Sequence, residues 1–283
     1  MIPDPRFLTQ PGSFWANVRT ISQAVGYTVR GASQIRVPTC EEIVQAYSGL
    51  KLKHDHIVDE TGQPTTLGKA LRDYFVFRAD RLNAFAEPRL MDVQRAREVF
   101  ESLRRDLKPK APLPRNKQKG EKKAPAFLTG IVNMLVEANA GDMSCDFDPR
   151  ELTTVTRDGA PLRTLARRVD GAFPSAVNPI AVWEIKEYYY TTTFGSRVAD
   201  GVYETLLDGM ELEELREHER VKVLHYLIVD AHFTWWGCGK SYLCRILDML
   251  HMGFVDEVLF GYEVVERLPA LVQEWRKLAQ GRR

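Results

Sequence analysis

Apolar residues recur with two different periods along the second half of the chain, and these periods predict alternating helices and strands. Apolar positions spaced three or four residues apart predict helices over residues 125–140, 196–217, 240–252 and 266–279. Short runs rich in β-branched and apolar residues predict strands over residues 151–156, 165–170, 181–186, 221–229 and 257–260. The pattern therefore predicts an α/β fold with a mixed central β-sheet flanked by helices.

The first part of the chain has helical spacing and few strand signals. Helices are predicted over residues 13–25, 39–47, 66–77 and 90–107. The segment from Pro38 to Glu42 contains a good N-capping signal for the second of these helices. We expect residues 1–107 to form a mostly helical accessory region.

A basic stretch separates the two parts. Residues 104–123 hold nine Lys or Arg and two acids, although the whole chain has a net charge of only +1. Because the stretch contains prolines and lacks apolar periodicity, we expect an exposed linker or loop over residues 108–124 and a second domain over residues 125–283. Such a stretch either attracts nucleic-acid phosphates in a salt-dependent way or only improves solubility.

Composition excludes several classes of protein. A hydrophobic content of 44% is typical of a globular domain, and no run of eighteen apolar residues or apolar leader occurs, so we expect a soluble cytoplasmic protein with no membrane partner. The four cysteines have no spacing typical of zinc ligands. The segment 237–241 is similar to a phosphate-binding loop, but Thr234 stands where its first glycine is required, so we do not expect a nucleotide site.

Candidate chemistry gathers around Asp170, Glu184 and Lys186. In a strand, side chains two residues apart share a face, so Glu184 and Lys186 point the same way and Ile185 points to the opposite layer. The turn-forming residues between 171 and 179 let the chain reverse, which would bring Asp170 beside Glu184. Two adjacent carboxylates need a cation between them, and their hard oxygens suit Mg²⁺ or Mn²⁺.

These residues also carry a family resemblance. Asp170, followed after thirteen residues by Glu184-Ile185-Lys186, resembles the signature of the PD-(D/E)XK nuclease superfamily, which includes most type II restriction endonucleases. The chain departs from it at Val169, where the family name has proline. The predicted order of elements over about residues 125–230 is similar to the family's common core, in which a helix, three antiparallel strands, a crossover helix and a further strand follow one another.

The resemblance implies a catalytic role for the cluster. Asp170 and Glu184 would hold Mg²⁺, with Mn²⁺ able to substitute, and Lys186 would assist the water that attacks a phosphodiester. Family members often have a supporting acid on the first core helix, so Glu137 is either a further metal ligand or a charged flank of an apolar stripe.

The resemblance implies a Mg²⁺-dependent type II restriction endonuclease that cuts double-stranded DNA at a specific sequence. A homodimer would cut both strands of a palindrome. The candidate DNA-binding residues are basic and lie near the predicted active strand, at a glycine turn or in the basic stretch: Arg197, Lys240, Arg115, Lys117 and Lys119. The helical region would then read the sequence or form the dimer. The alternatives are another nuclease of the superfamily, acting in phage defence, repair or junction resolution, and a non-catalytic DNA-binding protein.

Overall fold

The computed structural model describes residues 1–28, 34–115, 125–190 and 195–282, and the chain divides into two compact units. The sheet unit consists of Met1–Ile2, Arg89–Cys238 and Gly253–Arg283, and the helical unit consists of Pro3–Pro88 and Gly239–Met252. The prediction of a mixed α/β fold with a helical N-terminal part is confirmed. No helix of the described residues has the length and apolar character needed to cross a membrane.

The helical unit contains most of the helices predicted for the first part of the chain. Its elements are α1 (Pro5–Leu8), α2 (Gly12–Val25), α3 (Cys40–Gly49), α4 (Thr66–Asp80), the π-helix η1 (Arg81–Ala86) and α8 (Lys240–His251). The predicted cap of α3 is confirmed, because Thr39 and Glu42 form a reciprocal capping box. A buried ion pair between Arg78 and Asp248, 3.0 Å apart, ties α4 to α8.

The sheet unit is built around five strands in the order β1-β4-β5-β6-β7. The strands are β1 (Asp146–Phe147), β4 (Gly171–Phe173), β5 (Ala181–Glu187), β6 (Leu224–Asp230) and β7 (Glu257–Phe260). The pairs β1–β4 and β4–β5 are antiparallel, whereas β5–β6 and β6–β7 are parallel. A separate hairpin joins β2 (Thr154–Arg157) to β3 (Ala160–Thr164) through a turn at Asp158-Gly159.

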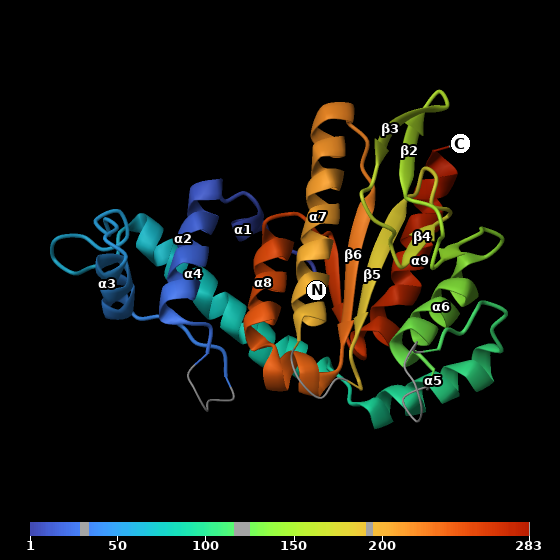
Figure 1. Ribbon diagram of the computed structural model, residues 1–283, viewed down its shortest axis with the longest axis horizontal. Coiled ribbons are helices and arrows are strands. Elements are labelled where there is room, and N and C mark those ends of the chain that lie inside the picture. Colours follow the sequence, from blue (N-terminus) through green and yellow to red (C-terminus); the bar gives the residue numbers. More distant parts are fainter. Residues whose placement is uncertain (29–33, 116–124, 191–194, 283) are drawn as a thin grey trace. The chain divides into compact units, whose positions relative to one another are not determined.

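Helices cover both faces of this sheet (Figure 1). The helices α5 (Val93–Leu107), α6 (Phe127–Ala140) and α9 (Glu263–Gly281) pack with Trp183 and Ile185 of β5 in one apolar core. The long helix α7 (Ser196–Glu219) packs on the opposite face with Val182. Two short elements, η2 (Glu87–Arg89) and η4 (Phe233–Cys238), complete the described chain.

The division into units differs from the predicted boundary at residue 107. Helix α5 belongs to the sheet unit because its buried Val99 and Phe100 pack against α6. Helix α8 belongs to the helical unit although it follows β6 in the chain. Both differences arise from contacts between segments far apart in sequence, which local periodicity cannot report.

The predicted strand over residues 165–170 is wrong, because the strand that pairs with β5 is β4, which begins at Gly171. The pairing of β4 with β5 requires a glycine at position 171, because the ring of Trp183 lies against the backbone there. A Cβ atom added at Gly171 would lie 2.1 Å from Cε2 of Trp183, so only glycine lets the two strands approach here.

We predict that Gly171→Ala destabilises the sheet unit by about 1–3 kcal/mol, because the added methyl group must displace a buried indole. Urea unfolding followed by circular dichroism measures the change. Gly281→Ala is the control, since a Cβ atom at Gly281 has no atom within 4 Å. Equal stability of the two variants would contradict the close contact between Gly171 and Trp183.

Candidate active site

Strand β5 separates an apolar face from a charged one. Trp183 and Ile185 point into the apolar core with α6 and α9. Glu184 and Lys186 alternate with them and face α7, so the predicted common face of these two residues is confirmed. Both are buried, with 0% and 7% of their surfaces exposed. A buried carboxylate is costly unless charged or hydrogen-bonding groups surround it, so the remainder of this face must compensate Glu184.

Asp170 reaches the same place from the start of β4. The register pairs Gly171 with Trp183, so Asp170 continues the antiparallel ladder next to Glu184. The backbone N–H of Asp170 donates to the carbonyl of Trp183 at 3.1 Å, and its Oδ2 accepts a hydrogen bond from the N–H of Ile185 at 2.7 Å. The structure thus brings together the two acids and the lysine of the predicted set.

Lys186 is held between β5 and α7. Its Nζ lies 2.8 Å from Oε2 of Glu184 and 3.3 Å from Oε2 of Glu204 on α7. The side-chain stem crosses α7 at Gly201, where an added Cβ atom would lie 3.0 Å from Cδ of Lys186. The glycine therefore makes room for the lysine beneath the helix.

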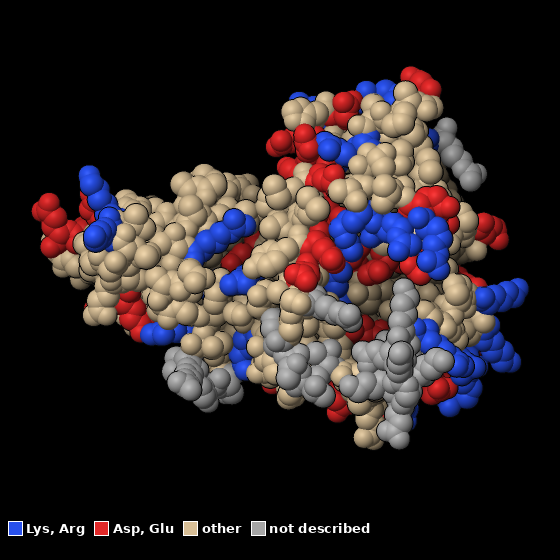
Figure 2. Space-filling view, viewed as in Figure 1, with Lys and Arg blue, Asp and Glu red and all other residues tan. Residues whose placement is uncertain are grey.

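Arg167 is a second cation at the cluster, and it contacts three acids. Its Nη1 lies 2.6 Å from Oδ2 of Asp208 and 2.9 Å from Oε1 of Glu184. Its Nη2 lies 3.1 Å from Oε2 of Glu184 and 3.3 Å from Oε2 of Glu204. Figure 2 shows acidic side chains over α7 with basic side chains beside them.

Burial and charge shift the proton affinities of the cluster in opposite directions. Burial, with the neighbouring charge of Glu184, raises the pKa of Asp170 to about 6, and burial raises the pKa of Asp208 to about 7. Burial also disfavours ionised Glu184, but Lys186 and Arg167 outweigh it and lower the pKa of Glu184. Glu184 is therefore the permanent anion of the cluster, and Asp170 and Asp208 bind protons more readily.

The cluster has more negative than positive groups. Four carboxylates, those of Asp170, Glu184, Glu204 and Asp208, face the two cations Arg167 and Lys186.

One oxygen atom of this cluster has no donor among the described residues. The buried Oδ1 of Asp208 accepts no hydrogen bond, whereas Oε1 of Glu184 contacts Nη1 of Arg167 in their ion pair. Hard carboxylate oxygens with unused lone pairs suit Mg²⁺ or Mn²⁺. Among the described residues, no three His, Cys, Asp or Glu side chains already form a metal-binding group. Arg167 lies between Glu184 and Asp208.

Glu137, predicted as a possible further metal ligand, is not part of this cluster. It lies near the C-terminal end of α6, which packs on the opposite, apolar face of the sheet. Its Oε2 accepts a hydrogen bond from the backbone N–H of Lys110 at 2.9 Å. The alternative of a charged flank on an apolar helix agrees with this position.

The predicted DNA-binding residues are dispersed along the chain. Arg197 lies in the first turn of α7, which begins beside the cluster, and Arg115 is exposed in an isolated bridge with Pro125. Lys240 begins α8 in the helical unit. Lys117 and Lys119 lie outside the described residues.

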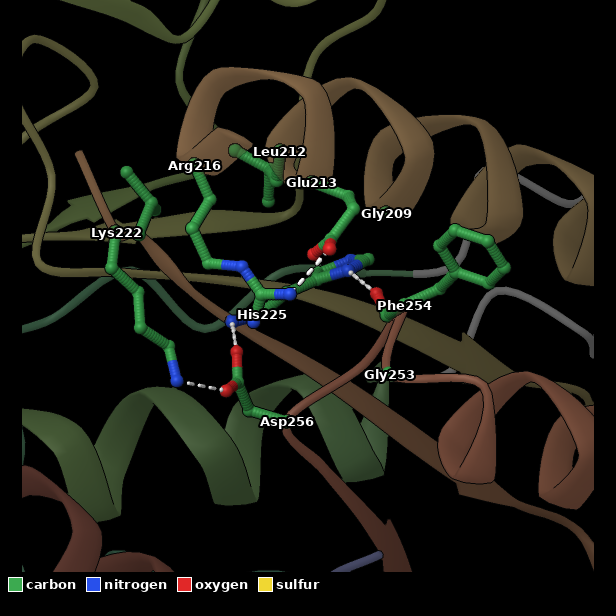
Figure 3. Close-up of a pocket in the computed structure, with 10 residues that line it drawn as sticks. Gly209, Leu212, Glu213, Arg216, Lys222, His225, Gly253, Phe254 and Asp256 are labelled. Carbon is green, nitrogen blue, oxygen red and sulfur yellow. Dashed lines mark hydrogen bonds and ion pairs between the residues drawn. The ribbon is translucent and has the colours of Figure 1, made fainter. Parts of the chain in front are cut away.

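A small cavity of about 20 Å³ lies farther along α7, near β6 and β7 (Figure 3). His225 lines it as a buried histidine, 2% exposed, with Nδ1 2.9 Å from the carbonyl oxygen of Phe254. Charged pairs such as Lys222 with Asp256, 2.7 Å apart, occupy its rim. The cavity has room for about one water molecule, so it is not a substrate site.

Sequence reasoning missed Arg167, Glu204 and Asp208. A signal for the two acids exists, because they are four residues apart on a predicted helix and so share one of its faces. On this helix the apolar Met210 is 52% exposed, whereas the polar Thr205 and Asp208 are fully buried. The inner face of α7 is polar where it covers the cluster.

Two family models match the chain. One, described as "Domain of unknown function (DUF7687)", matches residues 91–275, and the other, described as "Domain of unknown function (DUF7690)", matches residues 1–85. The interval between the two matches contains the boundary between Pro88 and Arg89 that separates the units in this part of the chain. No curated protein and no solved structure matches the chain.

A further acid of β5, the half-buried Glu187, leads to a prediction about pH. Its Oε2 accepts hydrogen bonds from N–H and Oγ1–H of Thr129 at the start of α6, at 3.0 and 3.1 Å. Burial raises its pKa from 4.5 to about 7. As pH rises between these values, the unfolded chain releases this proton first, so the contribution of Glu187 to folding stability falls.

We therefore predict that the folding stability of Glu187→Gln rises relative to that of the wild type as pH rises. Glutamine keeps a side-chain oxygen that accepts the hydrogen bonds of Thr129, and it has no proton to lose. Urea unfolding at about pH 5 and about pH 8 measures the difference between the two proteins at each pH. A difference that is the same at both pH values would contradict the raised pKa.

Proposed function

We propose that this chain, which belongs to the DUF7687 family, is a divalent-metal-dependent nuclease that hydrolyses phosphodiester bonds of double-stranded DNA. The observation that carries the proposal is the convergence of Asp170, Glu184 and Lys186 on one buried face of adjacent strands. The three residues on which the resemblance to the PD-(D/E)XK nucleases rests therefore lie close together in space, which supports the proposal.

Each residue of the set has a role in the proposed reaction. Asp170 and Glu184 would hold Mg²⁺ or Mn²⁺, which supplies charge neutralisation at the phosphate and acidifies bound water. Lys186 remains protonated, because its pKa is raised by Glu184 and Asp170 despite burial. It therefore orients the attacking water and stabilises negative charge that develops on the phosphate, rather than accepting a proton.

The most specific form of the proposal is a type II restriction endonuclease that works as a homodimer in the cytoplasm. Such an enzyme needs base contacts outside the active site, because phosphate contacts carry no sequence information. The helical unit, which has its own core of apolar residues, is the candidate for this recognition. Another nuclease of the same superfamily would use the same cluster without this specificity.

We predict that Glu184→Gln and Lys186→Met each lower Mg²⁺-dependent DNA cleavage by about 100-fold or more while DNA binding in EDTA is retained. Both substitutions preserve side-chain size at the cluster. The matched controls are Glu214→Gln and Lys222→Met, whose wild-type side chains are each 53% exposed. Full cleavage by purified Glu184→Gln protein would refute the proposed active site.

Sequencing of DNA ends separates the candidate functions. After incubation of phage DNA with the protein and Mg²⁺, we expect fragments whose ends all share one short sequence. Scattered ends would indicate a nuclease of another kind. Intact DNA that is bound equally well with Mg²⁺ and with EDTA would indicate a non-catalytic DNA-binding protein.

A further inference from the structure

We propose that Arg167 is a displaceable cation that occupies the metal site and exchanges with the divalent ion. Glu204 and Asp208 of α7 then extend the site beyond Asp170 and Glu184. The inference rests on the proposed function, since it concerns the same carboxylates. It also explains why the described acids do not already form a metal-binding group.

Arg167 lies where a shared cation would be expected. A single guanidinium nitrogen, Nη1, is within 3.0 Å of both Glu184 and Asp208, which come from different elements. The second nitrogen, Nη2, contacts Glu184 and Glu204. One group thus neutralises acids of β5 and α7 together, as a metal ion bound by several carboxylates would do.

Exposure indicates which groups can move. The side chain of Arg167 is 24% exposed, whereas those of Glu184 and Asp208 are fully buried. Arg167 also lies in a segment outside any helix or strand. The guanidinium can therefore turn into solvent and regain hydration, whereas the carboxylates stay on their rigid elements.

Lys186 does not share this freedom. Its side chain is 8% exposed, and its stem lies beneath Gly201 of α7. The two cations therefore have different roles: Lys186 is fixed at the site, and Arg167 leaves it. Removal of Arg167 leaves four carboxylates and one lysine at the site. Carboxylate oxygens are hard ligands, so this set favours a small divalent cation.

The test measures Mn²⁺ binding without DNA, by electron paramagnetic resonance of free Mn²⁺. We expect Arg167→Ala to bind Mn²⁺ about tenfold more tightly than the wild type, because no hydrogen-bonded guanidinium must be displaced. Added methylguanidinium should compete with Mn²⁺ in this variant and weaken its binding toward the wild-type level. Arg163→Ala is the control, because Arg163 also pairs with acids of α7, Glu211 and Glu214, but outside the cluster.

Each result distinguishes the inference from the proposed function. Unchanged or weaker Mn²⁺ binding by Arg167→Ala, with a wild type that binds Mn²⁺ and cleaves DNA, would overturn the exchange and leave the nuclease standing. Absence of Mn²⁺ binding and of cleavage in the wild type would overturn both.

Should circular dichroism show that Arg167→Ala is unfolded, Arg167→Lys replaces it. This variant keeps the charge with fewer hydrogen bonds, so we expect Mn²⁺ binding tighter than the wild type, and equal or weaker binding overturns the exchange.

Discussion

The burial of the Glu184 carboxylate is the constraint on which the sheet unit depends. Glu184 lies on a central strand with no exposed surface, and its ionised form persists because Lys186 and Arg167 lie within hydrogen-bonding distance. Leaving such a buried charge without its partners typically costs about 3–5 kcal/mol. The protein thus keeps a buried anion at the middle of its sheet by placing two cations beside it.

Neighbouring elements are adapted to this charge. Helix α7 presents Gly201, Thr205 and Asp208 where it covers the cluster, and it changes to Leu212 and Leu215 where it covers an apolar core. The other face of β5 carries Trp183 and Ile185 and packs as an ordinary core. One strand therefore packs into an apolar core with one face and holds the charged cluster with the other, a division that keeps the acids in place.

Local patterns were sufficient for much of this structure. The alternation around Glu184 and Lys186 predicted their common face, and the spacing of Phe127 to Ala138 predicted α6. The start of β4 was missed because Gly171 and Pro174 are turn-forming residues, and only the distant ring of Trp183 explains a strand there. Arg167 and the acids of α7 gain their meaning from contacts across the sheet face, which no local pattern contains.

The most direct test of the account is a crystal structure of the protein grown with Mn²⁺, in which anomalous scattering locates the ion. We expect an anomalous peak between the carboxylates of Asp170 and Glu184, with Arg167 turned away from Glu184. A structure in which Arg167 still joins Glu184 to Asp208 and no ion lies near Asp170 would contradict the account.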